Sequence, residues 1–129
     1  MSSRSLDTLD PRFRPKVDQL LQECSAHGLD MLVYCTLRSS QEQDQLYQVG
    51  RTKPGKIVTN AKAGQSAHNF GMAIDAAPLV GGKIAWNDHE DWALYGELAA
   101  RAGLEWAGTW KTFKEMPHVQ LPNWQELVK

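Results

Sequence analysis

The first part of the chain alternates apolar and polar positions in a way that predicts a helix and then a strand. Apolar residues recur at helical spacing from Phe13 to Cys24, with Pro15 near the start and Gly28 as a C-terminal stop. This spacing is typical of an amphipathic helix. The apolar run at 29–37 follows it and is rich in strand-forming residues, so it predicts a short buried strand.

A polar helix and a long irregular segment are expected next. Ser39 and Glu42 have the spacing of a capping box, and Gly50 would end the helix that they start. Residues 51–65 hold a proline and two glycines among polar residues, so they predict a loop without regular structure. Long loops inside compact domains usually serve a function, which marks this segment for attention.

The second half of the chain predicts a hairpin, a helix and a final strand. Residues 71–77 and 83–86 flank a Gly81-Gly82 turn, as in a β-hairpin. A helix capped near Asn87 or Asp88 should run to Gly103, and residues 118–121 read as a last short strand. Helices and hairpin-linked strands in this order favour an α+β fold, with a small antiparallel sheet flanked by helices.

Composition narrows the class of protein. The 129 residues suffice for one core, so we expect a single domain over residues 1–129 and a monomer. The net charge of −1 predicts no general attraction to nucleic acid or anionic lipid. Neither a run of about 18 apolar residues nor a secretory signal is present, so we expect synthesis to finish in the cytoplasm without stable membrane association. Cys24 and Cys35 sit among apolar neighbours and are interpreted as buried thiols.

Three residues are candidate metal ligands. His68 and Asp75 lie close together in the sequence, and His118 lies far along the chain. Two imidazole nitrogens and one carboxylate suit zinc, whose catalytic sites use three protein ligands and leave a fourth position for water. Gly71 would allow the backbone to bend between the first two ligands. Taken alone, each residue is more often a structural histidine or a turn-anchoring aspartate.

Two further residues could supply chemistry beside such a metal. Glu115 lies three residues before His118, with Pro117 between them, so its carboxylate can approach the metal and act as general base. The alternative is a solvated loop residue paired with a lysine. Arg38 at the exit of the first strand could stabilise an oxyanion or hold a substrate carboxylate, and the alternative is a surface arginine.

Several segments of the sequence, taken together, resemble a known family. They are Arg38-Ser39, residues 50–61, the block Ser66-x-His68-Asn69-x-Gly71-x-Ala73-x-Asp75, and the later Glu115-x-Pro117-His118. The chain from about residue 29 to 121 resembles the zinc D-alanyl-D-alanine carboxypeptidase superfamily, whose fold is called hedgehog/DD-peptidase-like. The similarity is greatest to its phage endolysin branch, the L-alanyl-D-glutamate peptidases.

The resemblance implies a site and a substrate. It implies one Zn²⁺ per chain and a carboxylate base, with peptidoglycan as the partner and stem-peptide hydrolysis during host cell lysis as the function. The roles fall on His68, Asp75 and His118 for the metal, on Glu115 and Arg38 for catalysis, and on Arg38 and Ser66 for substrate binding.

Other functions stay open at this point. A D-alanyl-D-alanine dipeptidase or carboxypeptidase would share the zinc, the base and the arginine, and would differ in its substrate pocket. A catalytically silent wall-binding module would keep the fold, although it would have no need for Glu115. A serine hydrolase built from Ser66, His68 and Asp75 is disfavoured, because the three lie too close in sequence and no G-x-S-x-G elbow is present.

Overall fold

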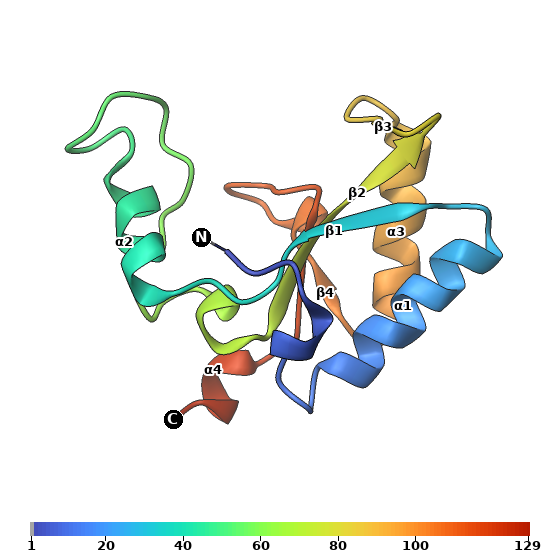
Figure 1. The fold of residues 1–129 in the computed structure, drawn as a ribbon, viewed down its shortest axis with the longest axis horizontal. Helices are drawn as coiled ribbons and strands as arrows, with labels where there is room; N and C mark the ends of the chain where they lie inside the picture. The colour runs from blue at the N-terminus through green and yellow to red at the C-terminus, as the bar shows by residue number, and fades with distance from the viewer. Residues whose placement is uncertain (1) are drawn as a thin grey trace.

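The computed structural model describes residues 2–129 and has the α+β architecture that the sequence predicts. A small antiparallel sheet has the strand order β1-β2-β5-β4, and β3 pairs with the far end of β2. The helices α1 and α3 lie together on one side of the molecule, and α2 with the long loop after it lies on the other (Figure 1). The strands are β1 (Met31–Cys35), β2 (Ala73–Val80), β3 (Lys83–Ile84), β4 (Glu105–Trp106) and β5 (His118–Gln120).

Three of the four helices within residues 2–129 begin and end near the residues that predict them, and the sequence does not predict the short C-terminal helix. The four are α1 (Arg14–Ala26), α2 (Ser40–Gln48), α3 (His89–Arg101) and the short α4 (Trp124–Leu127). Ser39 caps α2, since its hydroxyl accepts a hydrogen bond from the Glu42 N–H, and Asp88 caps α3 in the same way. Residues 51–65 contain neither helix nor strand, as expected. Within residues 2–129, no helix is both long and apolar enough to cross a membrane.

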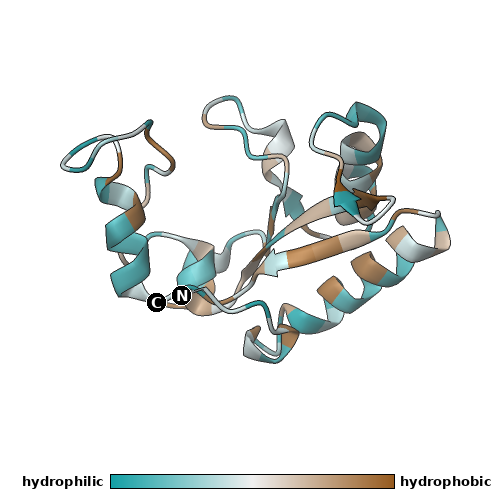
Figure 2. Ribbon diagram, turned by 45° about the horizontal axis from the view of Figure 1, so that its top comes forward, coloured by the Kyte–Doolittle hydropathy of each residue, from teal (hydrophilic) through white to brown (hydrophobic). Residues whose placement is uncertain are grey.

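The core lies between the sheet and the pair α1 and α3. The central strand β2 is buried from Ala73 to Pro78, and the inner stripe of α1 is fully buried at Val17 and Leu20. Figure 2 shows this contrast, because α1 carries a hydrophobic stripe while α2 is largely hydrophilic. The helix α2 therefore contributes little to the core, and its place in the molecule is beside the long loop.

One expectation about burial is wrong. The apolar run at 29–37 predicts a buried strand, but Leu32 in β1 is 37% exposed and only Cys35 of this strand is buried. The reason is its place in the sheet: β1 is an edge strand that pairs only with β2. Its apolar run reflects packing on one side rather than burial on both.

Gly71 connects a short 3₁₀ helix, Ala67–Phe70, to β2, and its backbone conformation suits glycine alone. Its φ is +68°, and a Cβ here would lie 2.8 Å from the carbonyl oxygen of Thr8. The segment around Thr8 is held against Gly71 by a hydrogen bond of 2.9 Å from the Asp10 N–H to the Gly71 carbonyl. Gly71 therefore joins the N-terminal segment to the turn that carries His68.

We expect Gly71→Ala to lower the free energy of unfolding by about 2 kcal/mol or more. A left-handed conformation costs roughly 1–2 kcal/mol in a non-glycine residue, and displacement of the Thr8 segment adds to this. Gly81→Ala is the matched control, because Gly81 has a φ of +61° with no atom within 4 Å of the added Cβ. Urea denaturation of both variants would measure the difference. Equal losses in the two variants would contradict the role of the Thr8 contact.

Candidate active site

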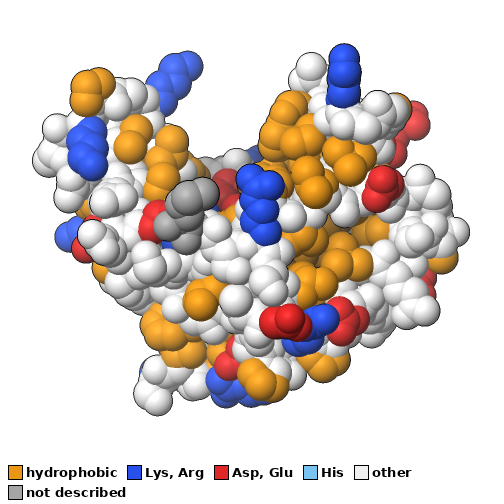
Figure 3. Space-filling model, in the orientation of Figure 1, with side chains coloured by type: hydrophobic (Ala, Val, Ile, Leu, Met, Phe, Trp, Pro, Cys, Tyr) orange, Lys and Arg blue, Asp and Glu red, His pale blue; other side chains and the backbone are white. Residues whose placement is uncertain are grey.

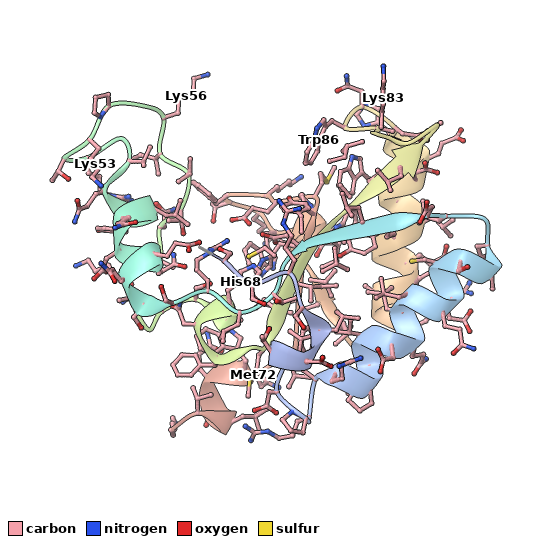
Figure 4. The ribbon with its side chains drawn as sticks, viewed as in Figure 1. Lys53, Lys56, His68, Met72, Lys83 and Trp86 are labelled. Atoms are coloured by element: carbon pink, nitrogen blue, oxygen red, sulfur yellow. The ribbon has the colours of Figure 1, made fainter. Side chains whose placement is uncertain are left out.

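A cavity of about 690 Å³ opens between the two sides of the molecule, and the candidate residues meet in it. Figure 3 shows the surface hollowed at this place. His68 lies at the base of the hollow, between a wall that carries Lys53 and Lys56 and an opposite wall that carries Lys83 and Trp86 (Figure 4). The cavity is lined by all six residues that the sequence singles out: Arg38, Ser66, His68, Asp75, Glu115 and His118.

Local structure brings the three candidate ligands together. His68 lies on the 3₁₀ helix before Gly71, whereas Asp75 and His118 lie opposite each other on the neighbouring strands β2 and β5. The Nε2 atom of His68 and the Nδ1 atom of His118 are each 3.2 Å from the same oxygen, Oδ1 of Asp75. All three residues are buried. Segments 43 residues apart in the chain therefore converge on one carboxylate oxygen.

The hydrogen bonds on the far side of each imidazole fix which nitrogen carries a proton in the neutral ring. The Nδ1 atom of His68 is 2.8 Å from the Thr36 carbonyl, which can only accept, so Nδ1 donates and Nε2 keeps its lone pair. The Nε2 atom of His118 is 2.8 Å from Oε1 of Gln120, so it donates as well and leaves the lone pair on Nδ1.

The amide of Gln120 is itself held in this orientation. Its Nε2 atom donates to the Glu105 carboxylate at 3.4 Å, and the Trp110 indole N–H donates to the same carboxylate oxygen at 2.8 Å. A carboxylate accepts only, so the amide nitrogen faces Glu105 and the amide oxygen faces His118. The sequence does not predict this hydrogen-bond network, which runs from Trp110 through Glu105 and Gln120 to His118.

The lone pairs of His68 Nε2 and His118 Nδ1 therefore both face the carboxylate of Asp75. The buried Nε2 atom of His68 makes no hydrogen bond of acceptable geometry within the described residues, although Asp75 Oδ1 is near. Two imidazole lone pairs and a carboxylate oxygen facing one another repel unless a cation lies between them. Burial opposes protonation of His68, yet the Asp75 carboxylate raises the His68 pKa to about 10. A field that favours a proton here favours a divalent metal ion too.

Glu115 lies at the edge of this cluster. Its Oε2 atom is 3.9 Å from His118 Nδ1, and its side chain is 35% exposed, so the carboxylate borders both the ligands and the open cavity. Burial raises the pKa of Glu115, opposed by His118 and reinforced by the negative charge of Asp75. Such a carboxylate can accept a proton more readily than a fully solvated one.

Arg38 lines the cavity but is more firmly held than a surface arginine. Its guanidinium donates to Gln43 Oε1 at 3.1 Å and to the Cys35 sulfur at 3.4 Å, and it lies 3.7 Å from Asp75 Oδ2. Gln43 is buried and donates in turn to the Ala61 carbonyl at 2.7 Å. Arg38 thus links the ligand cluster to α2 and the long loop, and Gln43 is a second site residue that the sequence did not reveal.

Ser66 and Cys35 complete the surroundings. The Ser66 hydroxyl caps the 3₁₀ helix by accepting from the His68 N–H at 3.3 Å, while both ring nitrogens of His68 face other groups. This geometry gives no support to a serine hydrolase. Cys35 and Cys24 are free, buried thiols, as expected, and the Cys35 sulfur lies 3.6 Å from His68 Nδ1, the nitrogen that faces away from Asp75.

Comparison with known proteins identifies the family of the chain. Residues 59–121 match the family described as D-alanyl-D-alanine carboxypeptidase. The chain is 41% identical over 125 residues to the peptidoglycan L-alanyl-D-glutamate endopeptidase CwlK of Bacillus subtilis, covering 89% of this chain and 75% of that one. It is 25% identical over 123 residues to the L-alanyl-D-glutamate peptidase of Listeria phage A118, covering 92% of this chain and 41% of that one.

A solved structure shares the fold. The Serratia marcescens L-Ala D-Glu endopeptidase ChiX superposes with a TM-score of 0.72 at 24% identity, covering 98% of this chain and 92% of that one. The hedgehog/DD-peptidase-like fold expected from the sequence is therefore confirmed. With the match over residues 59–121 and the 41% identity to CwlK, the chain belongs to the D-alanyl-D-alanine carboxypeptidase family of peptidases, together with its L-alanyl-D-glutamate peptidases.

Proposed function

We propose that this peptidase is zinc-dependent and hydrolyses the bond between L-Ala and D-Glu in peptidoglycan stem peptides. The observation that carries the proposal is the convergence of two imidazole lone pairs on one carboxylate oxygen inside an open cavity. The substrate is suggested by the relatives, because both curated proteins are named for this bond. Action as an endolysin in host cell lysis, after membrane permeabilisation, is part of the proposal and follows the phage relative.

The residues fit one zinc ion per chain. Zinc bonds of about 2.0–2.1 Å in tetrahedral geometry separate neighbouring ligand atoms by about 3.3 Å. The two nitrogen-to-oxygen distances of 3.2 Å match this separation. The ligand atoms that lie within 4.8 Å of one another form two groups that share Asp75, one with His68 and one with His118, so the two imidazoles would move closer together to hold one ion. His68 Nε2, Asp75 Oδ1 and His118 Nδ1 would hold the metal and leave a position toward the cavity. When bound, zinc would make a water molecule more acidic and polarise the carbonyl under attack.

Glu115 is assigned to proton transfer. Its carboxylate accepts the proton of the attacking water as the water oxygen bonds to the carbonyl carbon. The same proton then passes to the amine nitrogen of D-Glu as the carbon–nitrogen bond breaks. The position of Glu115, between the ligands and the open cavity, allows it to reach both the water and the leaving amine.

Arg38 is assigned to the substrate side of the cavity. Its guanidinium is fixed by Gln43 and Asp75, so it presents its positive charge at small entropic cost. A positive charge at this place can bind a D-Glu carboxylate or stabilise the oxyanion that forms on the attacked carbonyl. Ser66 contributes through its cap, which positions the backbone before His68.

Mass spectrometry of peptidoglycan digested by the purified zinc-loaded protein tests the proposal. The expected products are stem peptides with a new N-terminal D-Glu and glycan fragments that end in L-Ala. Release of D-Ala or D-Ala-D-Ala would instead indicate a carboxypeptidase or dipeptidase. Binding to the wall without any new peptide terminus would indicate a silent binding module and overturn the proposal.

A further inference from the structure

A second hollow of about 420 Å³ adjoins the ligand cluster and differs from the main cavity in chemistry. It shares Val58, Asp75 and Glu115 with the main cavity, so the two are continuous at the candidate metal site. Its volume lies within the range of about 300–1,000 Å³ typical of small-molecule sites. The rest of its lining is apolar or aromatic apart from one lysine, and comes from Tyr34, Trp86, Trp92, Lys114, Met116 and Pro117.

Trp86 presents a flat apolar face to this hollow. It follows β3, its side chain stands on the wall opposite Lys56 (Figure 4), and it is 52% exposed. The ring is nonetheless held in place, because it stacks on buried Trp92 with centroids 6.2 Å apart and meets Tyr34 edge-on at 6.3 Å.

The hollow offers hydrogen-bonding groups at the rim of this apolar face. Within residues 2–129, neither the Trp86 indole N–H nor the Tyr34 hydroxyl has a hydrogen-bond partner, and both residues line the hollow. The Trp86 carbonyl is already occupied, since it accepts from the Trp92 indole N–H at 2.9 Å. A flat apolar ring bordered by free donors suits a ligand with an apolar face and polar edges.

The proposed substrate contains a group with an apolar face and polar edges close to the scissile bond. The inference about this hollow therefore rests on the proposed function. In a stem peptide the L-Ala amine is joined to the lactyl group of an amino sugar, N-acetylmuramic acid. The sugar thus lies on the L-Ala side of the scissile bond, and the D-Glu carboxylates lie on the other. L-Ala and the lactyl group together span about 7 Å, which places the sugar in the space next to the metal site.

We infer that the Trp86 hollow binds the sugar ring, while the Arg38 side of the main cavity takes the D-Glu side of the substrate. A pyranose presents a face of C–H groups that packs on an indole, and its hydroxyl and N-acetyl groups reach the free donors. The sugar is uncharged once its lactyl carboxyl is amidated. The main competing occupant, the diamino acid further along the peptide, lies beyond D-Glu and therefore on the Arg38 side of the scissile bond, whereas the sugar lies on the L-Ala side.

The test compares two substrates of the same sequence, the disaccharide-linked tetrapeptide and its N-acetylated form without sugar. For the zinc-loaded parent protein, kcat/KM should be roughly five- to tenfold higher for the sugar-linked substrate, in line with one aromatic stacking contact. Trp86→Ala should reduce this ratio to near one, and Trp86→Phe should keep most of it. Val80→Ala is the control, because Val80 is 58% exposed on the same hairpin and should leave the ratio unchanged.

The ratio separates recognition from stability, since partial unfolding lowers activity on both substrates equally. A parent protein without preference for the sugar-linked substrate would overturn the inference, as would an undiminished preference in Trp86→Ala. In both cases cleavage between L-Ala and D-Glu would leave the proposed function standing. Cleavage of neither substrate at this bond would overturn the proposed function, and the inference with it.

Discussion

His68→Ala and His118→Ala are each expected to lose stoichiometric zinc, together with essentially all peptidase activity. The reason is geometric: removal of either imidazole leaves two ligands, and a catalytic zinc site needs three from the protein. Alanine offers no ligand atom to replace the imidazole nitrogen that lies 3.2 Å from Asp75 Oδ1. Metal analysis after purification without chelator, followed by competition with a zinc-binding dye, would measure the loss.

Two further variants serve as a control and as an intermediate case for the loss of zinc. His89→Ala is the matched control, because His89 is exposed at the start of α3 and should keep one zinc per chain. Gln120→Leu should bind zinc about 10- to 100-fold more weakly without abolishing binding, since it removes the acceptor that orients His118. Full zinc content in His68→Ala or His118→Ala, with a melting temperature like the parent's, would show that the ligands are wrongly assigned.

The residues at the centre of the site could be predicted, whereas the groups that orient them could not. His68 and Asp75 stand in one recognisable block and His118 in a later motif, and the structure brings all three together with Glu115 and Arg38. Their convergence on one carboxylate oxygen depends on strand register, since Asp75 pairs with His118 across β2 and β5. No spacing in the sequence fixes this register.

The role of Gln120 could have been inferred from the alternation of side chains along the last strand. His118 and Gln120 are two residues apart in a strand and therefore share a face, and Glu105 lies opposite Gln120 in the pairing of β4 with β5. Alternation could have suggested Gln120 once the last strand was placed. Gln43 showed no such pattern, because its contact with Arg38 depends on how α2 packs beside the sheet. Cys35 contacts Arg38 through the local path of the backbone at the exit of β1, which the sequence pattern does not specify. The exposure of β1 was missed for a related reason, since edge position is a property of topology.

Glu115→Gln should keep the fold and the zinc while losing about 10²- to 10⁴-fold in kcat, the usual loss when a general base is removed. The amide has nearly the shape of the carboxylate but cannot accept the proton of the attacking water. Because Glu115 is 35% exposed and 3.9 Å from His118 Nδ1, its change to an amide leaves the three ligands in place. Substrate binding, and hence KM, should change far less than kcat.

Steady-state kinetics on a soluble stem peptide, with zinc content and thermal melts measured on the same samples, would decide the role of Glu115. Glu90→Gln is the control for the chemical change alone, because Glu90 is exposed in the first turn of α3 and does not line either hollow. Loss of zinc together with activity would make Glu115 a metal ligand, for which its place beside Asp75 and His118 also allows. Near-normal turnover with zinc retained would remove it from the mechanism, and proton transfer would then have to run through solvent alone.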